Sequence, residues 1–105
     1  MKKYIVFEHR AECKHGASVS EMEAALMEGD PVEVARFDSW DAAKEYLQEH
    51  PGAYWTCKTF TGSVGVVHGC FTSECELDED GEILIQGDTE FCELRKYPDV
   101  PSCYC

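Results

Sequence analysis

Apolar and polar residues alternate over much of this chain, and the alternation is clearest between residues 71 and 77. Phe71, Ser73, Cys75 and Leu77 form one set of positions, and Thr72, Glu74 and Glu76 form the other. A period of two is typical of a β-strand with one buried and one exposed face. Turn-forming residues follow at 78–81 and end in glycine, after which residues 82–85 resume the strand pattern. We therefore predict a hairpin within residues 70–93.

The remaining pattern predicts further strands separated by turn-forming residues. We expect strands at residues 3–9, 32–37, 54–60, 64–77, 82–86 and 91–96. A loop is predicted at residues 10–16 and a turn at 61–63. The long strand over residues 64–77 contains Gly65 and Gly69, and we expect a bulge to bend it at one of them.

Two segments have a helical pattern. Ser18 and Ser20 each precede a glutamate by three residues, which is the spacing of a capping box, and they predict a short helix over about residues 20–28. A longer helix is predicted over residues 39–49, because its apolar positions fall on one stripe. That stripe consists of Trp40, Ala43, Tyr46, Leu47 and His50. We expect it to pack on the sheet.

Together these elements predict one α+β domain over residues 1–105. It would contain an antiparallel sheet of about five or six strands, with the longer helix as the main helix on one face and a second short helix. Residues 97–105 contain Pro98 and Pro101 and are predicted to form an irregular C-terminal tail.

Charge narrows the possible partners. The chain has 21 acidic residues against nine lysines and arginines, and its formal net charge is −12. Such a charge repels phosphate, so we expect no direct binding to nucleic acid and no binding to an anionic membrane. Basic protein surfaces and cations are the expected partners.

The chain is also rich in cysteine, with seven residues of this type. The apolar run after Met1 is too short for a signal peptide, and no segment is long enough to cross a bilayer. We therefore expect a cytoplasmic protein with reduced thiols, most of them buried as small apolar residues.

Two metal sites are alternatives to this interpretation of the cysteines and acids. Zinc ligands are available from Cys13, His15, His68, Cys70 and Cys75. Their spacings are unlike those of common zinc sites, and strand parity separates Cys75 from His68 and Cys70. For calcium, residues 76–83 are similar to the first eight positions of an EF-hand loop, but the twelfth position is Gly87 where calcium needs a carboxylate. We predict no cofactor, with zinc or calcium as the alternatives.

Motifs of catalysis are missing from the sequence. It contains no glycine-rich phosphate loop, no nucleophile elbow and no metalloprotease signature. We therefore predict that the protein is not an enzyme.

The candidate binding site is a set of eight acidic residues in the predicted hairpin, which we call the hairpin carboxylates. They are Glu74, Glu76, Asp78, Glu79, Asp80, Glu82, Asp88 and Glu90. Carboxylates held at fixed spacing on strands and a turn can imitate a row of phosphates. In general character the chain resembles the small acidic proteins of phages and mobile elements that block restriction or CRISPR nucleases by occupying their basic grooves. The resemblance implies an inhibitor or decoy that binds a basic, nucleic-acid-binding protein.

Two other interpretations stay open. One is a small zinc- or thiol-dependent metal-binding domain. The other is an acidic surface that serves only to keep the protein in solution. Sequence does not choose an oligomeric state.

Overall fold

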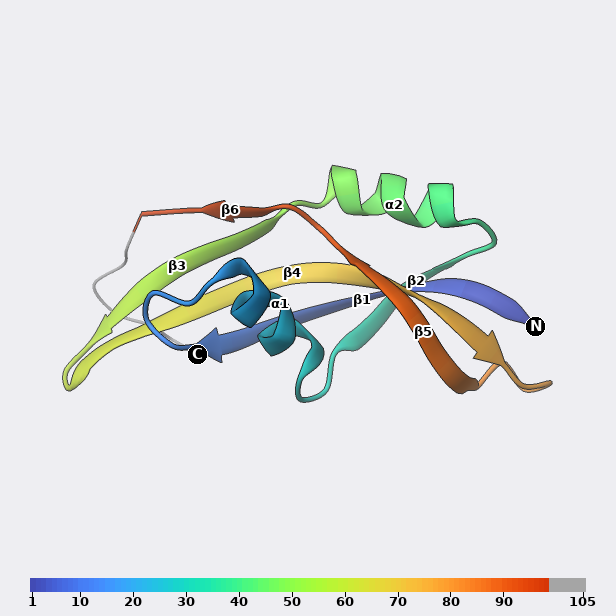
Figure 1. Cartoon of the computed structure of the whole chain (residues 1–105), viewed down its shortest axis with the longest axis horizontal. Coiled ribbons are helices and arrows are strands. Elements are labelled where there is room, and N and C mark those ends of the chain that lie inside the picture. The colour runs from blue at the N-terminus through green and yellow to red at the C-terminus, as the bar shows by residue number, and fades with distance from the viewer. Residues whose placement is uncertain (99–105) are drawn as a thin grey trace.

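A single long strand, β4, runs through the centre of the protein and pairs with three others (Figure 1). The computed structural model describes residues 1–98. In chain order the elements are β1 (Lys2–Cys13), α1 (Val19–Met27), β2 (Val32–Phe37), α2 (Trp40–Glu49), β3 (Gly52–Thr59), β4 (Gly62–Leu77), β5 (Ile83–Phe91) and β6 (Leu94–Lys96). The predicted α+β fold is confirmed, with a mostly antiparallel sheet of six strands and two helices.

The strand order places β4 between β1 on one side and two successive strands on the other. β1 pairs with β4 over twelve residues, from Lys2 opposite Glu76 to Cys13 opposite Gly65. Along the opposite edge, β3 pairs with residues 62–68 of β4 and β5 pairs with residues 71–77. β2 flanks β1, and β6 adds to β3 as the parallel strand of the sheet. The sheet is therefore long, and the molecule measures 50 × 23 × 20 Å.

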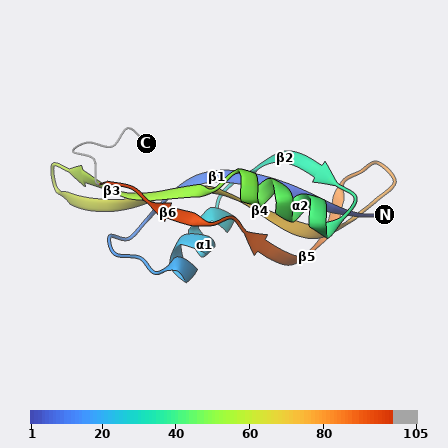
Figure 2. The same cartoon turned by 90° about the horizontal axis from the view of Figure 1, so that it is seen from above.

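The two helices cover opposite faces of this sheet. Val6 and Cys70 pack with Ala43 and Leu47 of α2, whereas their neighbours Phe7 and Phe71 belong to the cluster formed with α1. Adjacent residues of a strand point to opposite faces, so the two clusters lie on the two sides of β1 and β4. Figure 2 shows α2 lying over these strands.

Both helices begin within one residue of the predicted start. Ser18 caps α1, accepting a hydrogen bond from the backbone N–H of Glu21 at 3.2 Å, and the Glu21 side chain completes the capping box. Ser39 caps α2 by accepting from the N–H of Ala42 at 3.2 Å. A side-chain oxygen at this position satisfies a backbone donor that the first turn leaves unpaired.

Several strand boundaries differ from the prediction. The loop expected at residues 10–16 begins only after Cys13, because β4 is long enough to supply β1 with partners up to Gly65. Two strands form in the region where strands were expected at residues 82–86 and 91–96, but β5 extends to Phe91 and β6 begins only at Leu94. The tail expected at residues 97–105 is described only for Tyr97 and Pro98, which lie outside regular structure.

The expected bulge at Gly65 or Gly69 is wrong. The register of β1 with β4 is continuous past both glycines, and the irregularities lie instead between Ser73 and Leu77, on the side that faces β5. Gly69 serves close packing, because a Cβ atom there would lie 2.9 Å from the Sγ of Cys92. The glycine therefore makes room for a side chain from across the sheet.

The prediction that residue 72 lies on an exposed face is also wrong. Thr72 is fully buried and its hydroxyl donates a hydrogen bond to the carbonyl of Ile5 at 3.1 Å. Thr72 lies opposite Val6 on the face that α2 covers. The middle of this face is therefore buried, and the face is accessible to solvent toward the end of β4. Glu74 and Glu76 are half-buried there.

Candidate functional site

The turn between β4 and β5 is fixed by its own hydrogen bonds. The Asp78 side chain accepts hydrogen bonds through Oδ1 from the backbone N–H groups of Asp80 and Glu82, at 2.8 and 2.9 Å. The N–H of Asp78 donates to the carbonyl of Glu82 at 2.9 Å, and the N–H of Gly81 donates to the carbonyl of Asp78 at 3.1 Å. Gly81 has φ of 82°, a conformation that favours glycine. The predicted turn therefore forms, with Asp78 as its internal acceptor.

An arginine from the far edge of the sheet holds the same turn. Arg36 of β2 donates from Nη1 to the carbonyl oxygen of Gly81 at 2.8 Å. Glu33 orients the guanidinium, accepting from Nε at 2.6 Å and from Nη2 at 3.0 Å. The acidic turn is thus tied both locally and to the body of the sheet.

The structure divides the hairpin carboxylates into two groups. The first group has internal partners: Glu74 pairs with Lys2 at 2.9 Å, Glu76 pairs with the amino group of Met1 at 3.1 Å, and Asp78 closes the turn. The hydrogen bond and charge of Glu74 raise the pKa of Lys2. These three carboxylates take part in holding the fold.

The second group consists of exposed side chains. Its members are Glu79, Asp80, Glu82, Asp88 and Glu90, and we call them the exposed hairpin carboxylates. Among residues 1–98, none of the five forms an ion pair with a lysine or arginine. Five of the nine basic residues are engaged elsewhere, namely Lys2, Lys3, Lys14, Arg36 and Arg95. The five carboxylates are therefore free to meet an external cation.

The strand that carries two of these acids also exposes apolar side chains. Ile83, Leu84 and Ile85 of β5 are 38%, 63% and 66% exposed. Within the described chain, β5 pairs only with β4, so its outer edge presents unpaired backbone groups. Acidic and apolar groups thus share one accessible edge.

A hollow on the α2 side combines acids with aromatic rings. It has a volume of about 460 Å³. Its lining consists of Tyr4, Trp40, Glu74, Asp88, Thr89 and Glu90. The rings of Tyr4 and Trp40 meet edge to face with centroids 5.3 Å apart. Aromatic faces beside carboxylates are surroundings that favour a positively charged group. Sequence reasoning did not find the aromatic part of this site, although pairing of β1 with β4 puts Tyr4 opposite Glu74.

The candidate zinc ligands are not brought together. Cys70 lies under α2, whereas Cys75 packs with Ile5 and Leu77 on the other face. His68 is exposed and its Nε2 lies 2.8 Å from Oε1 of Glu8. Cys13 and His15 lie at the end of β1 and in the loop that follows it. No group of three or more His, Cys, Asp or Glu side chains within residues 1–98 is placed to hold a metal ion.

The calcium alternative meets a different obstacle. The Oδ1 atom of Asp78, which would be the third ligand position of the loop, already accepts two backbone N–H groups. Strands rather than helices flank the turn. The Asp and Gly residues at 78–81 are accounted for by turn geometry.

No protein-family model, curated protein or solved structure matches the chain. Over the described residues, neither helix has the length and apolar character needed to span a bilayer.

Proposed function

We propose that the protein is a non-enzymatic, acidic interaction protein that binds a basic, nucleic-acid-binding protein surface as an inhibitor or decoy. The observation that supports it most is the fixed turn, whose neighbouring carboxylates are exposed and unpaired within residues 1–98. A net charge of −12 gives the whole molecule an attractive field for such a surface.

The exposed hairpin carboxylates would act as phosphate mimics. A single exposed ion pair contributes only about 0.2–1 kcal/mol, and salt screens it over about 8 Å at physiological ionic strength. Binding therefore needs several pairs at once. A turn that is already rigid loses little freedom on binding, which favours the simultaneous formation of these pairs.

The hollow beside Trp40 would add specificity to this contact. It joins Asp88 and Glu90, two of the exposed hairpin carboxylates, to the rings of Tyr4 and Trp40. An arginine or lysine of the partner placed there would gain charge pairing and a cation–π contact, worth about 0.5–1 kcal/mol at an exposed site.

The finer form of the proposal concerns the partner. We propose a nuclease of the restriction or CRISPR type, bound by an inhibitor of phage or mobile-element origin. Nucleases of this kind have basic grooves for a phosphate backbone, and fixed carboxylates are the complementary surface. The zinc-dependent alternative has no ligand cluster within residues 1–98 to favour it.

A charge-reversal experiment tests the proposal. The hairpin variant carries Glu79→Lys, Asp80→Lys and Glu82→Lys, and the control variant carries Asp41→Lys, Glu45→Lys and Glu49→Lys on the exposed side of α2. Both triples change the net charge equally. We expect wild type and control to bind members of a panel of purified restriction and CRISPR nucleases at low salt, and the hairpin variant to lose binding at least tenfold.

Competition and salt complete the test. Duplex DNA should displace the protein from its partner, and affinity should fall steeply with salt concentration. Equal binding by the two triple variants, or no binding to any nuclease of the panel at low salt, would overturn the proposal.

A further inference from the structure

Two buried cysteines, Cys70 and Cys92, lie opposite each other between the part of β4 that pairs with β3 and the part that pairs with β5. The backbone N–H of Cys92 donates to the carbonyl of Cys70 at 3.0 Å, which continues the pairing of Phe71 with Phe91 by one residue. The N–H of Cys70 donates to the Sγ of Cys92 at 3.3 Å. Their exposed fractions are 4% and 6%. The sulfur of Cys92 is thus turned toward Cys70.

This placement suits a disulfide. Residues directly opposite on antiparallel strands have Cβ atoms about 4.5–5.5 Å apart, and a disulfide needs about 3.5–4.5 Å. Only a small approach of the two backbones is required. Two glycines border the sulfur of Cys92, since Cβ atoms at Gly52 and Gly69 would lie 3.0 and 2.9 Å from it. The sulfur therefore occupies a space that larger side chains at positions 52 and 69 would fill.

The two thiols differ in their hydrogen bonds. The Sγ of Cys92 accepts from the Cys70 thiol and from backbone N–H groups, and these bonds lower the pKa of Cys92 despite burial. The hydrogen bond to Cys92 and burial both raise the pKa of Cys70. The Sγ of Cys70 also lies 3.4 Å from the carbonyl oxygen of His50, a second acceptor for its proton. We assign Cys92 as the nucleophile, because its sulfur accepts the N–H of Cys70, which stabilises a thiolate, whereas the Cys70 thiol has the carbonyl of His50 to hold its proton.

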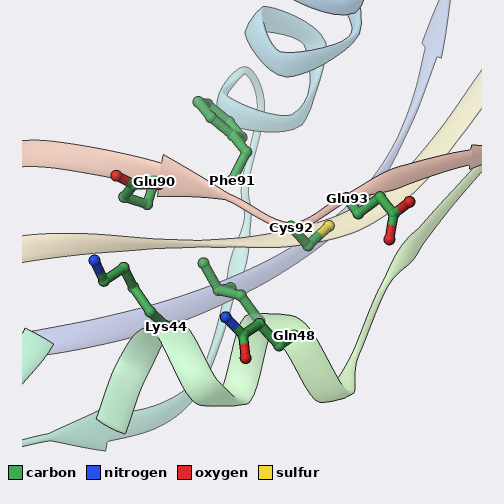
Figure 3. A pocket seen from close by; sticks show the side chains of 7 residues that line it. Lys44, Gln48, Glu90, Phe91, Cys92 and Glu93 are labelled. Atoms are coloured by element: carbon green, nitrogen blue, oxygen red, sulfur yellow. The ribbon is translucent and has the colours of Figure 1, made fainter. Parts of the chain in front are cut away.

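Hollows reach the pair from two directions. One, of about 240 Å³, lies between α2 and the segment after β5 and is lined by Lys44, Gln48 and Cys92 among others (Figure 3). The other, of about 300 Å³, lies at the end of α2 and is lined by residues that include His50 and Cys70. Both are large beside a single water molecule, which takes about 30 Å³ in the liquid. Each cysteine therefore borders a hollow that is large enough for a small oxidant.

We propose that Cys70 and Cys92 form a redox-active pair that hydrogen peroxide converts to an intramolecular disulfide. The Cys92 thiolate attacks one peroxide oxygen, the O–O bond breaks, and the hydroxide released takes a proton to become water. Cys92 is then a sulfenic acid. The Cys70 thiol gives up its proton and attacks the Cys92 sulfur, the S–O bond breaks, and a second water leaves. Two thiols lose two electrons in total, and one peroxide is reduced to two waters.

A Cys70–Cys92 disulfide would change the contact between β4 and the C-terminal end of α2. Cys70 would lose the thiol proton that faces the carbonyl of His50, which is the C-cap residue of α2. β4 would be linked covalently to the segment between β5 and β6. Glu90, one of the exposed hairpin carboxylates, also lines the hollow beside Cys92, but disulfide formation needs none of these carboxylates, so its test is independent of the proposed binding function.

The experiment treats the folded full-length chain with hydrogen peroxide and then counts thiols after denaturation. Mass spectrometry of proteolytic fragments identifies which of the seven cysteines are joined. We expect wild type to lose two thiols and to give the fragment that joins Cys70 to Cys92. Cys75→Ala and Cys57→Ala, which remove equally buried thiols, should form the same bond.

Single variants of the pair separate the two roles. In Cys70→Ala we expect Cys92 to stop at the sulfenic acid, which a dimedone probe traps. In Cys92→Ala we expect Cys70 to stay reduced. Circular dichroism before oxidation checks that each variant is folded, and the cysteine-to-alanine controls give the reference. A dominant bond between other cysteines, reaction only after unfolding, or equal dimedone labelling of Cys70 and Cys92 in the two single variants would overturn the proposal.

Discussion

Arg36 on β2 donates a hydrogen bond to the carbonyl of Gly81, 45 residues later in the chain, in the turn between β4 and β5. Arg36 lies opposite Ile5 and therefore on the face that carries Ile5 and Cys75. Burial raises the pKa of Cys75, and the positive charge of Arg36 opposes this shift. One side chain thus joins an edge strand to the acidic turn past β1, the strand that lies between β2 and β4. This contact adds to the local hydrogen bonds of the turn that carries Glu79, Asp80 and Glu82.

Removing the guanidinium should loosen the turn without unfolding the protein. In Arg36→Ala we expect faster hydrogen exchange at the amides of Gly81 and Glu82, because the carbonyl of Gly81 loses its anchor. Glu33→Ala leaves the Gly81 contact in place and should have a smaller effect. Equal exchange in wild type and Arg36→Ala would show that the turn is held by its local bonds alone.

Asp78 and its neighbour Asp80 should respond differently to substitution. Asp78→Ala removes the acceptor of two backbone N–H groups and should destabilise the protein by about 1–2 kcal/mol. Asp80→Ala should change the unfolding free energy by less than about 0.5 kcal/mol, because it is an exposed side chain. Urea denaturation of both variants measures the difference. Asp78→Asn keeps an acceptor oxygen and should recover most of the loss.

Packing on α2 gives a third prediction. Leu47 is 4% exposed and Ala43 is fully buried, whereas Trp40 is only half-buried at the start of the helix. Leu47→Ala should therefore lower the unfolding free energy by about 2–5 kcal/mol. A fully buried tryptophan would lose about 3–5 kcal/mol of unfolding free energy on replacement by alanine, and Trp40→Ala should lose less. A larger loss for Trp40→Ala than for Leu47→Ala would contradict this assignment of the core.

Gly69 and Cys92 should be coupled. Gly69→Ala places a Cβ atom 2.9 Å from the Cys92 sulfur and should destabilise the protein by about 1–3 kcal/mol through overpacking. The same substitution in a Cys92→Ala background should have a smaller effect, because the sulfur is gone. A double-mutant cycle by chemical denaturation measures the coupling, and additive losses would contradict it.

The thiol pair should also make stability depend on pH. The pKa of Cys92 is lowered to about 6, so the stabilisation that it adds is lost as the pH falls through that value. Relative to Cys92→Ala, the unfolding free energy of wild type should rise between pH 6 and the unfolded thiol pKa of about 8.5. Above that pH it should fall, because the raised pKa of Cys70 keeps its proton bound only in the folded state. A flat difference across this range would contradict the shift.

Local features of this fold are readable from sequence, and long-range ones are not. The turn at 78–81 and the cap at Ser18 depend on residues within a few positions, so their side-chain chemistry predicts them. Thr72 is buried because α2 lies over it. The ion-pair partner of Glu74 is Lys2, 72 residues earlier in the chain. Alternation identifies a strand but does not state what covers either face.

The candidate site shows the same division. Sequence identified the eight hairpin carboxylates, but not that Glu74 and Glu76 would pair with Lys2 and the amino terminus. Cys92 was assigned no site, because its position opposite Cys70 requires the register of β5 on β4. Once the pairing of two strands is known, the alternation of side chains along each strand shows which residues lie opposite each other on the same face.

The pairing of β1 with β4 also sets the order in which this protein can assemble. β1 is synthesised before β4, and the strand that pairs with it over twelve residues begins only at Gly62. Until β4 emerges, one edge of β1 stays open, and sheets with open edges can associate with one another. Contacts this distant in sequence also slow folding. The part of the chain made before β4, residues 1–61, has eleven acidic residues against seven lysines and arginines, and this smaller net charge of −4 helps to keep incomplete chains apart until β4 covers the open edge.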